Sequence, residues 1–420
     1  MRRATASFAL ALLALAPIVA SAQQQERLEF ENRVKAAMGR GADAPSQPGA
    51  GSPQKPMATP SDGDADGKLG SESMRKANRA AAEILKRRMN DQRPDDAKLL
   101  REAVGADVVV VSGVYDRVQD VLRAVEVKHV VIPPSLLEKL DLLPTQTLMV
   151  NCPGMVSPTA VKKIRDFVLR GGYLVTTDWA IGLAAKAFPG TIEHNGVRTP
   201  SDVVAAEVLD KSEPLLSHVR VLKDQPRWWL EGSSFPIRIL DKQRVHVLMT
   251  SSEMKKKYGD GAVVVSFHAG DGKVLHMTSH FYLQQAKLVS QAERKSGSSF
   301  AKDAGLADKD VAELKRRGVD PDAVKSGELN SAYSMQQVSA NLLVEKQKQN
   351  RELMNKRYRG RIDAAKVPLA QSPTAAPPKD GAKTLGRDWR VEVLEEKDGK
   401  VKVRDLFGDE GWVPAEAVKK

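Results

Sequence analysis

A series of short apolar runs, each followed by a segment with helical spacing, constrains the fold most. Residues 107–113 read DVVVVSG, and a continuous β-branched run is typical of a parallel strand buried on both faces. Similar runs occupy residues 129–132, 148–151 and 173–177. Between the last two, residues 157–170 begin with Ser-Pro and stop before Gly-Gly, which are the start and stop signals of a helix. The alternation predicts an α/β domain with a mainly parallel, doubly wound sheet.

Three further apolar runs add later strands, at residues 245–250, 262–267 and 273–279. The Gly-Asp-Gly between the last two runs is a hairpin signal. We expect the α/β domain to cover residues 95–290, with the flavodoxin-like strand order as the default. A polar insertion at 291–330 follows, and then a helix at 331–360 that packs back on the sheet.

The N-terminus has the three parts of a secretory signal peptide. Arg2 and Arg3 precede an uncharged, Ala/Leu-rich run, and Ala20-Ser21-Ala22 offers a cleavage site. We expect residues 1–22 to be removed on export, leaving a periplasmic or secreted protein. The apolar run is too short for a stable anchor, and no other segment approaches ~20 apolar residues, so no membrane span is predicted.

The next part of the chain reads as a tether. Residues 23–72 are expected to form a disordered linker, because they are rich in Gln, Pro, Gly, Ser and Asp and contain few apolar residues to bury. A short helix is expected at 73–94. Cys152 is the only cysteine, so no intramolecular disulfide forms.

The formal charge of the whole chain is +12, and loss of Arg2 and Arg3 lowers it by two. In an exported protein this charge points to anionic envelope polymers or lipid headgroups rather than nucleic acid. A solubilising surface charge is the alternative.

One stretch carries a resemblance to a known superfamily. The run TLMVNCPGMVSPTAVKKIRDFVLRGGYLVTTDWA resembles the class I glutamine amidotransferase-like superfamily, in particular its trehalose-utilisation-protein-like branch. The segment GDGKVLHMTSHFY is similar to the last strand of that branch with its terminal histidine. The resemblance covers roughly residues 105–290 and implies the α/β fold.

The same resemblance identifies a departure at the reactive position. Active members have a cysteine between glycines at the elbow after the later strand, whereas this chain has Asp178 between Thr177 and Trp179. A carboxylate is a poorer acyl-transfer nucleophile than a thiolate, and without flanking glycines the strained elbow is harder to hold. The resemblance therefore implies a domain that kept the scaffold and lost glutaminase chemistry.

A second resemblance lies at the C-terminus. The tail GRDWRVEVLEEKDGKVKVRDLFGDEGWVPAEAV resembles a bacterial SH3-like domain, so a small all-β barrel is expected at residues 362–420. In exported bacterial proteins such domains often bind cell-wall material. The resemblance implies peptidoglycan, another anionic envelope polymer or an envelope protein as the partner. Trp389 and Trp412 form an aromatic platform in one interpretation and fill the barrel core in the other.

In an open α/β sheet, ligands bind beyond the carboxyl ends of the strands. The catalytic candidates there are Asp178, His280 and Cys152: a Cys-His pair would supply a nucleophile and an Asp-His pair a general acid and base. The alternative is a polar rim without turnover. The expected binding residues are Gly113, Tyr115, Asn151, Gly154 and Trp179, together with Trp389 and Trp412 in the tail.

No metal and no cofactor are predicted. His276 and His280 are four residues apart on a strand, which separates them by roughly 13 Å, too far to share one ion. The pair Trp228-Trp229 either stacks on a sugar or is buried at the sheet edge, and we favour burial.

The sequence therefore predicts an exported, non-catalytic binding or scaffold protein of the bacterial envelope. The alternative is an envelope hydrolase that acts on carbohydrate or peptide through Asp178 and His280, with Cys152 as a further candidate. A third hypothesis is a partner-binding helix at 331–357 with an apolar stripe left uncovered by the sheet.

Overall fold

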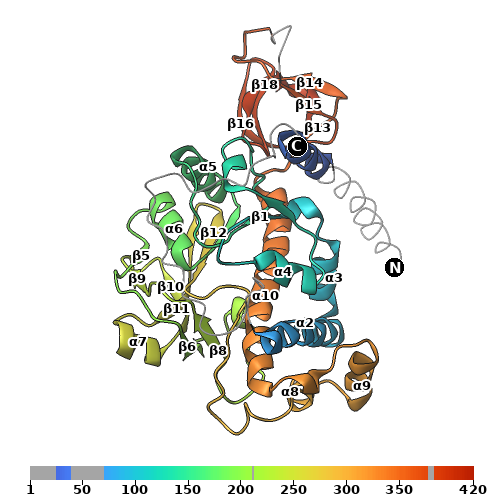
Figure 1. Ribbon diagram of the computed structural model, residues 1–420. Helices are drawn as coiled ribbons and strands as arrows, with labels where there is room; N and C mark the ends of the chain where they lie inside the picture. Colours follow the sequence, from blue (N-terminus) through green and yellow to red (C-terminus); the bar gives the residue numbers. More distant parts are fainter. Residues whose placement is uncertain (1–24, 39–70, 211, 377–382) are drawn as a thin grey trace, which may run out of the picture. The chain divides into compact units, whose positions relative to one another are not determined.

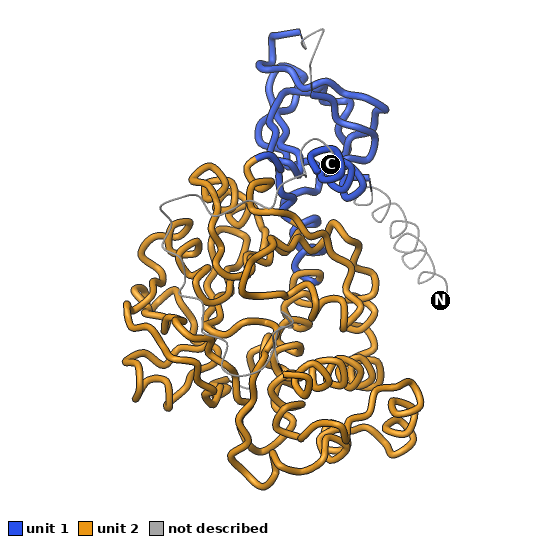
Figure 2. Tube along the Cα trace, viewed as in Figure 1, with its two compact units in different colours: residues 1–41, 139–144, 348–420 blue, residues 42–138, 145–347 orange. Residues whose placement is uncertain are grey.

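A computed structural model describes residues 25–38, 71–210, 212–376 and 383–420. The expected signal peptide, residues 1–22, and most of the expected linker lie outside these residues. The chain divides into two compact units, shown in Figure 2. Unit 1 comprises residues 1–41, 139–144 and 348–420, and unit 2 comprises residues 42–138 and 145–347.

Unit 2 is a mixed α/β unit whose central strands are parallel (Figure 1). The parallel strands, in spatial order, are β2 (Val130–Ile132), β1 (Val108–Val111), β3 (Thr147–Val150), β4 (Tyr173–Thr177) and β12 (Gly272–Met277). All residues of β1, β3, β4 and β12 are buried, as expected for strands covered on both faces. The apolar runs of the sequence thus mark the parallel strands, which confirms the mixed α/β class.

Helices cover both faces of this sheet. α5 (Pro158–Leu169) and α6 (Ile181–Ala187) contact β4 and β12. The other face belongs to a core shared with α2 (Glu72–Gln92), α4 (Val118–Ala124) and α10 (Ser326–Lys356). Ser157 caps α5 by accepting a hydrogen bond from the Ala160 amide, and Pro158 occupies its first turn, as the sequence signals predict.

An antiparallel extension continues the sheet beyond β12, through β11 (Ala262–Ala269), β10 (His246–Thr250) and β7 (Glu207–Val208). β9 (Ile237–Ile239) pairs with β11 and with β5 (Ile192–His194). A separate pair, β6 (Asp202–Ala205) and β8 (Arg227–Leu230), contains Trp228 and Trp229. Both tryptophans are buried, which confirms the interpretation that they pack in the protein.

The remaining helices of unit 2 are α3 (Pro94–Glu102), α7 (Ser252–Tyr258), α8 (Gly297–Asp303) and α9 (Asp308–Arg316). α8 and α9 lie in the segment expected to be a polar insertion. α10 is buried along residues 329–344, and its Ser334 accepts a hydrogen bond from Trp228 Nε1 at 2.9 Å. The hypothesis of an uncovered partner-binding stripe on this helix is therefore wrong, because its apolar residues form part of the core.

Unit 1 contains an antiparallel β region. Its main sheet has the order β18 (Glu410–Pro414), β17 (Lys400–Asp405), β16 (Arg390–Lys397), β13 (Gly360–Ile362) and β19 (Val418–Lys419). A second pair consists of β14 (Lys366–Pro368) and β15 (Thr384–Gly386). Alternate residues of β17, including Val401 and Val403, are buried, so period-2 patterning fixes which strand face meets the core.

A helix at residues 25–38 also belongs to unit 1, and it corrects part of the linker prediction. Phe30 and Val34 are buried, and the guanidinium of Arg33 lies 4.1 Å from the ring centroid of Phe407. The buried carboxylate of Glu26 accepts a hydrogen bond from the Arg390 amide at 3.2 Å. Composition alone predicted a tether, but these few side chains give the helix a face to bury.

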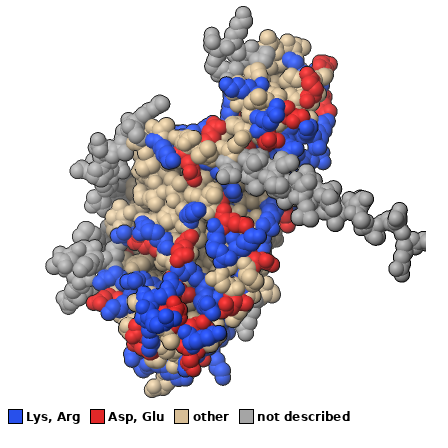
Figure 3. Space-filling view, turned by 90° about the vertical axis from the view of Figure 1, so that its right-hand side faces the viewer, with Lys and Arg blue, Asp and Glu red and all other residues tan. Residues whose placement is uncertain are grey.

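Surface charge of both signs is present on the face drawn in Figure 3, where Lys and Arg are intermingled with Asp and Glu. Between α2 and α9, Arg87 pairs with Asp310 at 2.8 Å, and Arg317 beyond α9 pairs with Glu83 at 3.1 Å. This pattern agrees with a solubilising role for many of the charges.

Among the helices in the described ranges, none combines the length and apolar character that crossing a bilayer requires.

Candidate functional site

The elbow after β4 is the centre of the candidate site. β4 ends at Thr177, a 3-10 turn follows at Asp178–Ala180, and α6 begins at Ile181. Asp178 adopts φ +47°, the positive value of a nucleophile-elbow residue between a strand and a helix. Asp tolerates this region better than most residues because its short side chain bonds locally.

Space for this turn comes from a glycine on another loop. Gly154 has φ +69°, and a Cβ on it would lie 2.4 Å from the Cβ of Ala180. The resemblance implied that the elbow is harder to hold without flanking glycines, and the turn nevertheless forms at Asp178. Gly154, which follows β3, supplies the close approach that the neighbours of Asp178 do not.

Three side chains with different chemistry converge at the elbow. Asp178 Oδ2 lies 3.2 Å from His280 Nε2, and the Cys152 thiol lies 3.5 Å from the same oxygen. The ligand atoms of all three residues lie within 4.8 Å of one another. Glu231 is the fourth member of what we call the elbow cluster, with Oε2 3.6 Å from His280 Nε2.

Parallel pairing explains why these residues meet. Cys152 follows β3, Asp178 follows β4 and His280 follows β12, and these strands are successive neighbours in the sheet. The sequence prediction that Asp178 and His280 meet beyond the strand ends agrees with this geometry. Glu231 follows β8 and was not predicted, because nothing in its local sequence marks it.

Asp116 links the end of β4 to the segment that follows β12 through hydrogen bonds. Its Oδ2 accepts hydrogen bonds from Thr177 Oγ1 at 2.9 Å and from the Phe281 amide at 3.1 Å. One carboxylate thus joins the residue before Asp178 to the residue after His280. Sequence reasoning missed Asp116, although it directly follows the predicted binding residue Tyr115.

Three of the four residues of the elbow cluster are buried, and only Glu231, whose side chain is 14% exposed, reaches solvent. The exposed fractions are 0% for Cys152, 0% for Asp178 and 2% for His280. Burial lowers the pKa of His280, but the nearby carboxylates of Asp116, Asp178 and Glu231 outweigh it, and the pKa lies above its ordinary value. The carboxylates around His280 thus favour its protonated form relative to a free imidazole.

His276 takes no part in this cluster. Its Nδ1 lies 2.9 Å from Thr176 Oγ1 inside the sheet, and burial lowers its pKa to about 3. The two histidines thus behave oppositely, because the charged neighbours that stabilise the cationic form of His280 have a much smaller effect on His276.

Three of the predicted binding residues hold the backbone near Cys152. A Cβ on Gly113 would lie 2.3 Å from the Cys152 carbonyl oxygen, so only glycine allows that approach. Buried Asn151 accepts a hydrogen bond from the Val118 amide at 3.1 Å. Tyr115 is partly buried and donates its amide to the Cys152 carbonyl at 3.3 Å. These contacts fix the turn that holds Cys152.

Beside the elbow cluster lies an open pocket of about 360 Å³, here called the aromatic pocket. Its rings are Trp179, Phe235 and His194, with centroids 5.4 Å apart for Trp179–Phe235 and 4.8 Å for His194–Phe235. The Arg198 guanidinium lies 5.8 Å and 5.9 Å from the centroids of Trp179 and Phe235. Lys186 adds a second cation to the lining.

Trp179 and Gly154 line a smaller pocket of about 210 Å³. The Trp179 indole donates a hydrogen bond to the Ser233 carbonyl at 2.7 Å, so its ring is held in place. Of the aromatic pocket, the sequence predicted only Trp179. His194, Arg198 and Phe235 lie in loops and short strands whose function no local pattern marks.

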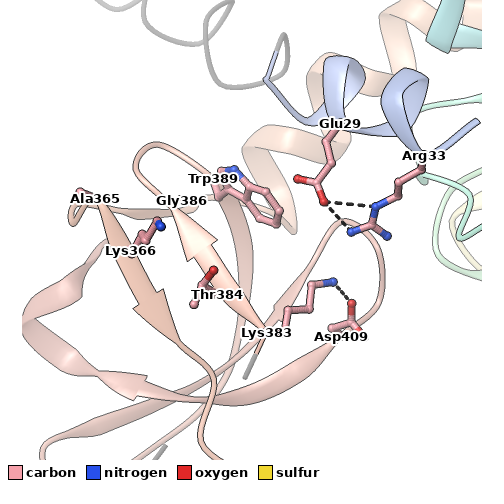
Figure 4. A pocket seen from close by; sticks show the side chains of 9 residues that line it. All are labelled: Glu29, Arg33, Ala365, Lys366, Lys383, Thr384, Gly386, Trp389 and Asp409. Atoms are coloured by element: carbon pink, nitrogen blue, oxygen red, sulfur yellow. Dashed lines mark hydrogen bonds and ion pairs between the residues drawn. The ribbon is translucent and has the colours of Figure 1, made fainter. Parts of the chain in front are cut away.

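Unit 1 has a separate pocket of about 570 Å³ (Figure 4). It is lined by Glu29, Arg33, Ala365, Lys366, Lys383, Thr384, Gly386, Trp389 and Asp409. Arg33 pairs with Glu29, and Lys383 pairs with Asp409. The exposed fractions of Trp389 and Trp412 are only 8% and 7%. The two tryptophans therefore fill the β region and form no open platform, although Trp389 borders the pocket.

No protein-family model matches the sequence, and no curated protein matches it significantly. Solved structures with similar folds include a glutamine amidotransferase from Thermotoga maritima, at 13% identity and TM-score 0.33, covering 59% of this chain and 98% of that one. A ThuA-like protein from Bacteroides uniformis matches at 14% identity and TM-score 0.30, covering 42% and 80%. A β-galactosidase from Rahnella sp. R3 matches at 14% identity and TM-score 0.31. The match covers 51% of this chain and 32% of the β-galactosidase, so this chain spans about a third of that protein.

Proposed function

We propose that this chain is an exported, non-catalytic binding or scaffold protein of the bacterial envelope. It is built on a degenerate amidotransferase-like domain of flavodoxin-like order and an SH3-like module that contacts the cell wall. The observation that carries the proposal is the burial of Cys152, Asp178 and His280 in the elbow cluster. A group at 0% exposure has no surface on which a substrate can react, whatever its chemistry.

The aromatic pocket is the ligand site in this proposal. Flat rings that are fixed in position stack on the apolar faces of sugars, and Arg198 and Lys186 attract negative charge. A saccharide that carries a carboxylate or phosphate can stack on the rings and pair with these cations. Such acidic sugars occur in envelope polymers, which agrees with the proposed export.

The pocket of unit 1 is the proposed wall contact. Its paired cations and anions, with Trp389 at the border, suit a partner that carries both charges, such as a peptide with free amino and carboxyl groups. Exposed Lys366 is the lining residue best suited to a test, because Lys383 also neutralises buried Asp405 at 2.9 Å.

Sedimentation of the full mature chain with purified peptidoglycan tests both sites. We expect the double variant Phe235→Ala, Arg198→Ala, which alters the aromatic pocket of unit 2, to bind peptidoglycan more weakly than the parent chain. Lys366→Glu, which alters the pocket of unit 1, should also weaken binding. Lys397→Glu, an exposed lysine of the same β region outside the pocket, is the matched control and should bind like the parent. Equal retention of all variants, or no retention of the parent chain, would remove peptidoglycan as the partner.

An envelope hydrolase is the second candidate. The elbow conformation of Asp178 and its 3.2 Å contact with His280 favour it, because a carboxylate at such a position can form a covalent ester intermediate. It requires an opening of the cluster to substrate. Turnover of cell-wall fragments that disappears in Asp178→Asn would establish it, whereas unchanged fragments after long incubation would support the binding role.

A further inference from the structure

The elbow cluster has the donor types and spacing of a metal centre. Its donor atoms are a thiol sulfur, an imidazole nitrogen and a carboxylate oxygen, from Cys152, His280 and Asp178, and all lie within 4.8 Å of one another. A second carboxylate, that of Glu231, lies 3.6 Å from His280 Nε2 but outside this group. In tetrahedral coordination with bonds of about 2.0–2.3 Å, neighbouring donors are roughly 3.2–3.8 Å apart. The Asp178–His280 and Cys152–Asp178 contacts measure 3.2 and 3.5 Å.

The positions of the donors are set by the fold. Three of them follow the adjacent strands β3, β4 and β12, and the fourth follows β8. Asp116 holds the strand ends from behind, and Gly154 makes room for the elbow. Such supporting contacts preorganise a site before an ion arrives. Solvent reaches the cluster at Glu231, whose side chain is 14% exposed. A metal ion would therefore enter the site from that side.

We propose that Cys152, Asp178 and His280 bind one zinc ion, and that the neighbouring Glu231 side chain turns toward the ion to complete a tetrahedral structural site. The mixture of sulfur, nitrogen and carboxylate donors suits Zn²⁺, whereas Ca²⁺ and Mg²⁺ take oxygen donors only. Binding replaces the S–H bond of Cys152 with an S–Zn bond, and the thiol proton and any imidazolium proton pass to solvent. No oxidant or reductant is needed.

This inference does not depend on the proposed function and departs from the sequence expectation of no metal. The sequence expectation considered His276 and His280 on one predicted strand, with His268 across the hairpin, whereas the cluster joins residues that follow four separate strands. A zinc ion here would tie β3, β4, β12 and the loop after β8 together. It would also fix Asp178, whose neighbour Trp179 forms part of the aromatic pocket.

The test uses the full mature chain purified under reducing conditions without chelator. Elemental analysis should give about one zinc per chain. Added Co²⁺ should give the near-ultraviolet thiolate-to-cobalt absorption band in the metal-free protein. Cys152→Ser keeps a hydrogen-bond donor for Asp178 but loses the sulfur, so it should lose the cobalt band. It and Glu231→Gln should each bind zinc at least ~10-fold more weakly.

His268→Gln is the matched control, because this exposed histidine on β11 is outside the cluster; it should bind zinc like the parent. Circular dichroism checks that each variant is folded. A folded, reduced parent chain that takes up neither zinc nor cobalt would overturn the proposal. Zinc affinity unchanged in both Cys152→Ser and Glu231→Gln would also overturn it, since the ion would then be bound elsewhere.

Discussion

At the scale of single residues, the elbow depends on a conformation that few side chains adopt. Asp178 has positive φ although neither neighbour is glycine. The required space comes from Gly154 on a different loop. Gly154 itself has positive φ, so a substitution there meets both backbone strain and a steric clash.

Gly154→Ala should destabilise unit 2 about 1–3 kcal/mol more than Gly190→Ala does, because only the first substitution adds overpacking. Both glycines have positive φ, but a Cβ on Gly190 meets nothing within 4 Å. Urea unfolding of the two variants measures the difference. Equal destabilisation would show that the elbow tolerates a methyl group beside Ala180.

His276 should make unit 2 sensitive to mild acid. Its folded pKa of about 3 lies below the unfolded value of about 6.5, so the unfolded chain binds more protons between these values. Its contribution to stability is therefore complete above pH 6.5 and falls as the pH drops, by up to about 1.4 kcal/mol per unit. In His276→Gln the free energy of unfolding should fall less steeply from pH 6.5 to 5, while exposed His268→Gln should keep the parent slope.

At the scale of elements, short apolar patterns decide whether a polar segment orders. The helix at residues 25–38 lies in a stretch whose average composition resembles a linker. Phe30 and Val34, four residues apart, share one face and are buried. α10 shows the complementary case, since its many polar residues are buried with hydrogen-bond partners such as the Tyr333–Gln337 pair at 2.9 Å.

Phe30→Ala should destabilise unit 1 by about 3–5 kcal/mol, because it removes a fully buried ring and leaves a cavity. Leu28→Ala on the same helix should change stability by less than about 0.5 kcal/mol, because Leu28 is 54% exposed. Thermal unfolding combined with proteolysis of the helix distinguishes them. Similar small effects for both variants would mean that the helix does not depend on this packing.

At the scale of the whole molecule, buried chemistry and open pockets are separated. Cys152, Asp178 and His280 are buried, while the aromatic pocket and the pocket of unit 1 are open to solvent. This division is the basis of the proposed binding role. The mixed surface charge in Figure 3 favours solubility over a single strong electrostatic field.

Export should be visible in the mature chain. In a bacterial host, the protein in the periplasmic fraction should begin at Gln23 by intact mass, after cleavage behind Ala22. Replacing Ala20 and Ala22 with Arg should retain the precursor, because the cleavage site requires small residues. Unprocessed parent protein found only in the cytoplasm would refute the export hypothesis.

The sequence by itself determined the parallel strands and the start of α5, which follow from period, burial and capping signals that act over a few residues. The elbow position of Asp178 was implied by the resemblance to the amidotransferase-like superfamily. The meeting of Asp178 and His280 was also predictable, because carboxyl ends of parallel strands share one edge of the sheet.

Only the tertiary structure decided the rest. Glu231, Asp116, Arg198 and Phe235 reach their sites from separate loops, and no local pattern records such long-range contacts. Burial of the elbow cluster and of Trp389 and Trp412 depends on which segments cover them. The physical reason is that accessibility and donor spacing are properties of the packed chain, whereas propensity and periodicity are properties of neighbouring residues.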